Sequence, residues 1–208
     1  RYIVSKIVLP KADCVRVASN RIKNSLNAKR YTLNAPITVL PIWIDVEKIK
    51  NAEPKPFPTK FDFTVLWVGR LEKEKNCSLA IDAFSKFIKK FSNAGLIIVG
   101  DGSERQKLES RIKSCKLSNN VIMVGWQNNI AGYYKSADVL LVTSWYEGHG
   151  LQMVEARIAG IPVITTDVGV AREVGAHITD YTPESITQTL VKLHNQEFPK
   201  PQEYLYPY

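Results

Sequence analysis

Residues 62–69 read DFTVLWVG, residues 78–91 read SLAIDAFSKFIKKF, and residues 96–99 read LIIV. The first and third segments are short, continuous apolar runs, which are typical of strands buried on both faces of a sheet. In the second segment the apolar residues recur at helical spacing. A strand, a helix and another strand in this order predict a βαβ unit with two parallel strands.

The same alternation continues to residue 194. Further strands are expected at 120–124, 138–142, 162–165 and 177–178, and further helices at 103–115, 130–136, 151–159 and 183–194. Ser103 is the expected N-cap of the first of these helices. The predicted fold class is therefore α/β, with a Rossmann-like parallel sheet flanked by helices. Such sheets bind ligands at the carboxyl ends of their strands.

The chain divides by composition into four parts. Residues 1–45 hold an expected strand at 14–18, a helix at 19–27 and a strand at 37–40. Residues 46–60 are the expected linker, because 53–59 (EPKPFPT) contain three prolines. Residues 61–196 form the α/β domain, and residues 197–208 are a tail rich in Pro and Tyr. Because the sequence starts with neither Met nor a leader, we expect it to be an excised piece.

Charge is unevenly distributed along the 208 residues. Residues 1–60 carry 12 Lys or Arg against 4 Asp or Glu, which equals the net charge of +8 for the whole chain. A basic first quarter suits nucleic acid, anionic lipid or a phosphorylated substrate, or is simply a solvated surface. No aromatic residues interleave with the cations in the manner of a nucleic-acid site, so no nucleic acid is expected. Peripheral contact with the anionic inner face of the cell membrane remains a hypothesis.

The cysteines and the apolar runs bear on location. Cys14, Cys77 and Cys115 are odd in number and widely spaced, with no CxxC. They indicate reduced thiols in a cytoplasmic protein rather than a disulfide framework or a zinc site. No stretch approaches the roughly 18 consecutive apolar residues of a spanning helix.

The strongest local motif is EGHGLQMVE at residues 147–155. Two carboxylates, Glu147 and Glu155, stand eight apart around two glycines, where a strand leads into a helix. The first N–H groups of that helix, from Gly150, Leu151 and Gln152, suit a pyrophosphate. Glu155 then lies inside the helix, where it can accept hydrogen bonds from a ribose, and Glu147 stays on the loop. The alternative interpretation is a turn with two surface glutamates.

Two further motifs follow expected strands. In VGRLEKEKN (68–76), Arg70 offers a planar fork for phosphate oxygens and Lys75 a flexible point charge. In VGDG (99–102), Gly100 and Asp101 follow the next strand, but the spacing is not that of a GxGxxG dinucleotide site. Either motif alone is also compatible with an ordinary solvent-exposed loop.

Together, six motifs in this order resemble glycosyltransferase family 4, a retaining family with the GT-B fold. They are VGRL with a Lys five residues after its Arg, IVGDG, Val121 to Gly125, YYKSADVLLVTS (133–144), the E-x7-E element, and EARIAGIPVI (155–164). The resemblance covers about residues 37–195. It implies the C-terminal, donor-binding half of a GT-B enzyme, with 1–45 a remnant of the N-terminal acceptor domain and hinge.

The resemblance implies roles for individual residues. Arg70 and Lys75 hold the diphosphate, Glu147 lies beside the sugar, and these three are the expected catalytic residues. Glu155 binds the ribose. The other expected donor-binding positions are Gly69, Gly100, Asp101, Gly125, Trp126, His149, Gly150, Leu151 and Gln152, with His149 more typical of a space-filling residue. No metal or other cofactor is expected, since the sequence contains no DxD motif.

The predicted reaction moves a sugar from a UDP-, GDP- or ADP-sugar to an unidentified sugar or lipid-linked acceptor, with retention. Two alternatives stay open: a nucleotide-sugar-binding module without turnover, and a GT-B epimerase. The intact set of Arg70, Lys75, Glu147 and Glu155 argues against decay of the site.

Overall fold

The computed structural model describes residues 11–28, 35–199 and 202–206. The chain divides into two compact units, Arg1–Ile44 and Asp45–Tyr208. Residues 1–10 and 29–34 of the predicted remnant, and residues 200–201 and 207–208 of the predicted tail, lie outside the described residues.

The first unit contains a small parallel βαβ arrangement. Strand β1 (Val15–Val17) pairs with β2 (Ile37–Val39) in parallel, with Val15 opposite Ile37, and α1 (Asn20–Ala28) connects them. The Ser19 hydroxyl accepts a hydrogen bond from the Ile22 N–H at 3.3 Å, which satisfies one free donor of the first turn of α1.

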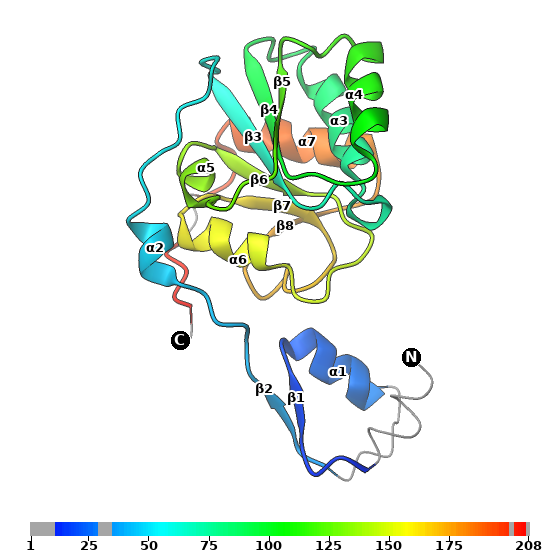
Figure 1. The fold of residues 1–208 in the computed structure, drawn as a ribbon, viewed down its shortest axis with the longest axis vertical. Helices are drawn as coiled ribbons and strands as arrows, with labels where there is room; N and C mark the ends of the chain where they lie inside the picture. Colours follow the sequence, from blue (N-terminus) through cyan, green and yellow to red (C-terminus); the bar gives the residue numbers. More distant parts are fainter. Residues whose placement is uncertain (1–10, 29–34, 200–201, 207–208) are drawn as a thin grey trace. The chain divides into compact units, whose positions relative to one another are not determined.

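The second unit is built on a six-stranded sheet in which every neighbouring pair is parallel (Figure 1). The order across the sheet is β5-β4-β3-β6-β7-β8. The strands are β3 (Phe63–Val68), β4 (Ala94–Val99), β5 (Val121–Gly125), β6 (Val139–Val142), β7 (Val163–Thr166) and β8 (His177–Thr179). The order reverses between β3 and β6, and ligands of open α/β sheets bind at such a switch point.

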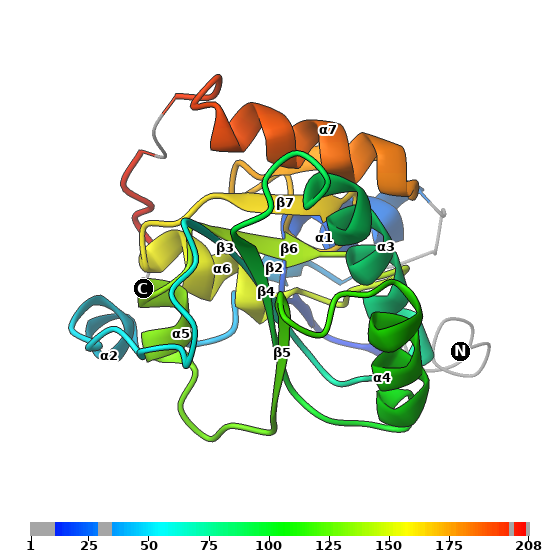
Figure 2. The ribbon, with the colours of Figure 1, turned by 90° about the horizontal axis from the view of Figure 1, so that it is seen from above.

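Helices cover both faces of this sheet (Figure 2). On one face, α3 (Cys77–Phe87) packs against α4 (Arg105–Ser114) and α7 (Pro183–His194). On the other, α6 (Leu151–Ile158) packs against α2 (Val46–Lys50) and α5 (Ala131–Lys135). The predicted α/β fold with a Rossmann-like parallel sheet is thus confirmed. Among the described helices, none has the length and apolar character needed to cross a bilayer.

Apolar burial explains why these elements form. All six residues of β4 are buried, as expected for a central strand covered on both faces. The helical spacing of α3 places Phe84 and Phe87, both fully buried, on the face that packs against the sheet and α7. Packing in the core therefore fixes the positions of the carboxyl ends of β3, β4 and β6.

Two local predictions were wrong. Helix α4 begins at Arg105, and Ser103 does not cap it: the Ser103 N–H and hydroxyl both donate to the Glu72 carboxylate, at 3.1 and 2.7 Å. Helix α3 ends at Phe87 instead of residue 91. In the first case a partner distant in sequence outcompetes the local cap.

The stretch expected as a linker contains a helix. Helix α2 is capped by the Asp45 side chain, which accepts from the Lys48 N–H at 3.0 Å. After α2 the chain lies along α5, where the Lys55 N–H donates to the Gly132 carbonyl at 3.0 Å. Lys50 at the end of α2 forms an ion pair at 3.1 Å with Glu203, which lies near the end of the chain. The Lys55 bond ties the first flank of the second unit to α5, and the Arg157 guanidinium of α6 donates to the Gln202 carbonyl of the second flank at 2.9 Å.

Candidate functional site

A cavity of about 410 Å³ opens at the carboxyl ends of the strands in the second unit. Eight of the predicted site residues line it: Gly69, Arg70, Lys75, Gly100, Trp126, Leu151, Gln152 and Glu155. They come from the loops after β3, β4 and β5 and from the start of α6. Segments up to 86 residues apart in sequence are thus brought to one hollow, at the place where parallel sheets bind ligands.

Close backbone contact shapes the floor of this cavity. Gly100 has φ of +138°, and a Cβ there would lie 1.9 Å from the Gly69 carbonyl oxygen. Gly69 in turn donates its N–H to the Val99 carbonyl at 3.1 Å. Only glycine at position 100 lets these two strand ends approach, because it lacks the Cβ that would collide. Both glycines line the cavity, which therefore lies over the ends of β3 and β4.

Lys75 and Glu147 form the central ion pair of the site. The Lys75 ammonium lies 2.7 Å from both carboxylate oxygens of Glu147, whose side chain is only 6% exposed. Ser144 and the Gln152 amide each donate to the same carboxylate at 2.8 Å. Glu147 is therefore held rigidly as an acceptor, and Lys75, which also lines the cavity, carries a positive charge to its wall.

The turn that carries Lys75 is supported from below by a buried polar relay. This turn is a 3-10 helix, η3 (Lys73–Lys75). The Trp67 indole N–H donates to the Thr143 hydroxyl at 3.2 Å, and that hydroxyl lies 3.2 and 2.9 Å from the carbonyls of Lys75 and Asn76. Trp67 of β3 and Thr143, directly after β6, thus hold η3 at a fixed position above the sheet.

Arg70 lies at the rim of the cavity. Its guanidinium donates to Glu74 at 2.9 Å, and its side chain is 63% exposed. An exposed ion pair of this kind contributes little to stability. The guanidinium can therefore exchange Glu74 for an anionic ligand at small cost.

Glu155 lines the cavity from inside α6. The Tyr134 hydroxyl donates to its carboxylate at 2.8 Å, and Tyr134 is fully buried. Burial raises the pKa of Glu155, and the Tyr134 hydrogen bond lowers it in part. The pKa of Tyr134 is raised well above its ordinary value by burial and by the neighbouring carboxylate, so the tyrosine stays a donor. One oxygen of Glu155 is thus fixed by the protein.

The start of α6 completes the wall. Gly150 precedes the helix with φ of +91° and ψ of 56°, a left-handed conformation that favours glycine. Leu151 and Gln152, the first two helical residues, line the cavity. The first N–H groups of a helix have no partners within it, so this end is suited to an anion.

Five of the predicted site residues do not line the cavity. They are Glu147, described above, and Gly150, Gly125, Asp101 and His149. Gly150 acts through the conformation just described. Gly125 accepts from the Gly100 N–H at 2.9 Å, and Asp101 bonds its neighbour Gly102 and Arg105. His149 is buried, and its carbonyl accepts from the Val170 N–H at 2.8 Å. These residues shape the loops that border the cavity.

Some contributors were not singled out from the sequence. Ser144 and Tyr134 hold the two glutamates, while Gln127 and Ile130 line the cavity. Tyr134 falls within a motif that the sequence does display, but nothing in YYKSADVLLVTS tells which tyrosine faces Glu155. Within the described part of the chain, no group of three or more His, Cys, Asp or Glu side chains is placed to hold a metal ion.

Comparison with known protein families agrees with this geometry. Residues 48–204 match the family described as glycosyl transferases group 1, which accounts for most of the chain and for every residue of the cavity. This chain belongs to that family.

Relatives of this group 1 glycosyltransferase include an uncharacterized glycosyltransferase of Methanocaldococcus jannaschii, 28% identical over 75% of the chain and 40% of the relative. A poly(glycerol-phosphate) alpha-glucosyltransferase of Bacillus subtilis is 34% identical over 62% of the chain and 20% of its own length. An alpha-monoglucosyldiacylglycerol synthase of Acholeplasma laidlawii is 37% identical over 50% of the chain and 26% of its own length. The chain therefore spans well under half the length of these relatives.

Solved structures share the fold. TarM of Staphylococcus aureus, crystallised with UDP, fondaparinux and alpha-GlcNAc-glycerol, superposes with a TM-score of 0.79 at 23% identity, over 93% of this chain and 39% of TarM. The pneumococcal O-GlcNAc transferase GtfA, in complex with UDP and GlcNAc, gives 0.76 at 22% identity, over 96% of this chain and 42% of GtfA. The group 1 glycosyltransferase chain thus has the GT-B type of sheet.

Proposed function

We propose that the second unit is the donor half of a retaining glycosyltransferase that transfers a sugar from a nucleoside-diphosphate sugar to an acceptor. The observation that carries the proposal is the cavity at the carboxyl edge of the sheet, where Arg70, Lys75, Glu155 and the start of α6 meet. Two cations and a helix N-terminus suit a diphosphate, and the half-buried Glu155 carboxylate suits a ribose diol.

The diphosphate is assigned to Arg70, Lys75 and the first N–H groups of α6. As the bond between sugar and diphosphate breaks, negative charge grows on the departing nucleotide, and fixed positive charge stabilises it. Lys75 is fixed by Glu147 at 2.7 Å and by the support of η3. It is therefore positioned before the donor arrives, whereas Arg70 must first leave Glu74.

The remaining parts of the donor, its nucleoside and its sugar, are assigned from the residues on either side of the proposed diphosphate site. Glu155 has one oxygen bonded to Tyr134, which leaves its other oxygen for the ribose. Trp126 is 67% exposed at the cavity wall, next to Gly125 and Gly100, and offers a surface for the base. Glu147 lies next to Lys75 and Gln152, on the side assigned to the transferred sugar.

UDP is the proposed nucleotide, because two structures with the same fold carry UDP in their crystals. Retention is supported by the names of two relatives, which specify alpha-glucosyl products. Nucleotide sugars of glucose are alpha-linked, so an alpha product keeps the configuration. The proposed acceptor is a sugar or a lipid-linked acceptor.

Transfer is proposed to need no metal, as the resemblance to family 4 implies. The cations that neutralise the diphosphate are then Arg70 and Lys75 alone. We expect UDP affinity to be the same in EDTA and in millimolar Mg²⁺; a requirement for the ion would contradict this assignment.

Calorimetric titration with UDP, GDP and ADP tests the donor assignment. We expect saturable binding of UDP and a loss of about tenfold or more in Arg70→Ala, because one charged hydrogen bond contributes about 1.5–3 kcal/mol. Arg172→Ala is a matched control: Arg172 is also an exposed arginine paired with a carboxylate, Asp167, but it lies outside the cavity.

The outcomes separate the alternatives. Equal losses in Arg70→Ala and Arg172→Ala would contradict the assigned site. Because this chain carries only the proposed donor half, transfer is measured on the full-length protein, where binding of UDP-glucose without transfer to any acceptor would favour a module without turnover. Interconversion of UDP-sugars without an acceptor would favour an epimerase.

A further inference from the structure

The carboxylate of Glu155 has two oxygens in different surroundings. The Tyr134 hydroxyl, from α5, donates to Oε2 at 2.8 Å. Within the described part of the chain Oε1 has no protein donor, and this oxygen is not buried. Glu155 is half-buried and lines the donor cavity. One oxygen is therefore held by the protein, and the other is available to a ligand.

Tyr134 is a fixed donor. Its side chain is fully buried, and Glu155 is the one hydrogen-bond partner of its hydroxyl among the residues that the structure describes. The pKa of Tyr134 is raised well above its ordinary value by burial and by the Glu155 carboxylate, so the hydroxyl keeps its proton. A buried hydroxyl is normally hydrogen-bonded, which holds this proton on Oε2 of Glu155.

This arrangement decides where Glu155 takes up a proton. Because the Tyr134 proton already points at Oε2, a proton added to the carboxylate goes to Oε1, the available oxygen. A protonated Oε1 donates a hydrogen bond instead of accepting one, and the carboxyl group loses its charge. A ribose diol offers two hydroxyl donors, so it binds the charged form more strongly than the neutral one.

The charged groups around α6 do not pair with Glu155. Strands β6 and β7, which pack against α6, read VLLV and VITT and carry no acidic or basic side chain. Within the described ranges no cation lies within ion-pair distance of Glu155. The charged and titratable neighbours are Lys135 on α5, Glu47, Lys48 and Lys50 on α2, Arg157 on α6, Glu173, Glu203 and Tyr204 on the side of Arg157, and Arg70, Lys75 and Glu147 around the cavity.

Burial and Tyr134 therefore act on Glu155 in opposite directions. Burial raises the pKa of Glu155, because the charged form loses hydration, and the Tyr134 hydrogen bond lowers this pKa, because it stabilises the carboxylate. Removal of the hydroxyl would leave the effect of burial unopposed. Glu155 would then take up its proton at a higher pH.

We propose that Tyr134 is a positioning residue of the donor site: its hydroxyl holds Oε2 of Glu155 and so keeps Oε1 as a charged acceptor for the ribose hydroxyls. The ribose contact rests on the proposed transferase function. The action of Tyr134 on Glu155 belongs to the protein alone and is present without nucleotide.

Two tyrosines that are adjacent in sequence provide the test and its control. Tyr134→Phe removes the hydroxyl and keeps the buried ring. Tyr133→Phe makes the same change one residue earlier on α5, where the side chain is also buried but its ring contacts Phe57 and Lys55. Thermal unfolding checks that both variants are folded.

Calorimetry compares UDP with its 2′,3′-dideoxy analogue from about pH 5 to about pH 8. The two nucleotides carry the same diphosphate, so the ratio of their affinities reports the diol contact alone. We expect wild type to prefer UDP at the upper pH and to lose this preference as pH falls. In Tyr134→Phe the loss should occur about one pH unit higher, which corresponds to about 1.4 kcal/mol, and in Tyr133→Phe it should not move. Equal weakening of both nucleotides with an unmoved pH dependence would assign Tyr134 a structural role only and overturn the proposal.

Carbon-13 NMR titration of the glutamate carboxyl groups without nucleotide separates this proposal from the donor assignment. The Glu155 signal is identified by its absence in Glu155→Gln. Its midpoint should lie about one pH unit higher in Tyr134→Phe than in wild type or Tyr133→Phe. An unmoved midpoint would overturn the role of Tyr134 whatever the nucleotides do. A raised midpoint in a protein that binds no nucleotide would overturn the donor assignment, and the ribose contact with it.

Discussion

Burial raises the pKa of Glu155, and a hydrogen bond from Tyr134 at 2.8 Å lowers it only in part. A carboxyl group whose folded pKa is raised contributes stability below its unfolded pKa and loses it as pH rises through the folded value. Its charged form, however, is the better acceptor for a ribose. Folding stability therefore favours the neutral form of Glu155, whereas ribose binding favours its charged form.

Glu155→Gln should show both effects. The free energy of unfolding should rise relative to wild type at pH 8 and stay nearly unchanged at pH 4, because glutamine has no charge to bury. UDP affinity at pH 8 should fall about tenfold with the loss of charged hydrogen bonds of roughly 1.5–3 kcal/mol. Urea unfolding at the two pH values and calorimetry measure these effects; equal stability changes at both would rule out the titration of Glu155 as their cause.

The Lys75–Glu147 pair predicts a double-mutant result. Lys75→Met leaves the Glu147 carboxylate, 6% exposed, with only Ser144 and Gln152 as partners. We expect a loss of about 3 kcal/mol in the free energy of unfolding, since removing one partner leaves a buried charge uncompensated. The double variant Lys75→Met/Glu147→Gln should recover most of it in urea titrations. Additive losses would show that the two side chains do not interact.

At the scale of elements, the entry into α6 connects backbone conformation to ligand binding. Gly150 and Gly160 flank this helix, both with positive φ, of 91° and 88°. A Cβ at Gly150 would lie 2.2 Å from the end of the Met153 side chain, whereas one at Gly160 meets open space. Both alanine variants should lose about 1–2 kcal/mol of stability from the left-handed backbone.

Only Gly150→Ala should also weaken UDP binding, because it disturbs the loop that aims the first N–H groups of α6. Thermal unfolding and calorimetry on the two variants provide the comparison. If Gly160→Ala weakened UDP equally, the effect would come from helix stability rather than from the phosphate end.

At the scale of the whole molecule, the basic first 60 residues, with 12 cations against 4 carboxylates, favour peripheral binding to an anionic membrane. We expect the protein to sediment with phosphatidylglycerol vesicles at low salt and to be released at about 0.5 M salt, where charges are screened. Phosphatidylcholine vesicles are the control. Equal sedimentation with both lipids, or none with either, would refute an electrostatic membrane contact.

Much of the architecture of the second unit was accessible from the order of the residues. Apolar runs such as 62–69 and helical spacing such as that of Phe84 and Phe87 are local properties, so they predict which segments are strands and helices. Motif positions placed Arg70, Lys75 and Glu155 at strand ends and a helix start. Since parallel strands end at one edge, their convergence could be expected.

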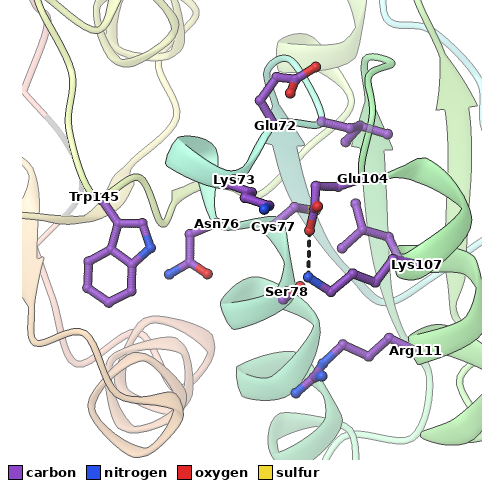
Figure 3. Close-up of a pocket in the computed structure, with 11 residues that line it drawn as sticks. Glu72, Lys73, Asn76, Cys77, Ser78, Glu104, Lys107, Arg111 and Trp145 are labelled. Atoms are coloured by element: carbon purple, nitrogen blue, oxygen red, sulfur yellow. Dashed lines mark hydrogen bonds and ion pairs between the residues drawn. The ribbon is translucent and has the colours of Figure 1, made fainter.

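Contacts between segments far apart in sequence could not be read in this way. The partner of Ser103 is Glu72, 31 residues away, and the partner of Glu155 is Tyr134 rather than Tyr133. A pocket lined by Trp145, Asn76 and Glu104 forms where the loop after β6 meets the starts of α3 and α4 (Figure 3). Local pattern specifies each element, because propensity and periodicity act within a few residues. Packing of the assembled sheet chooses the side-chain partners, because those distances are set only when all the strands are in place.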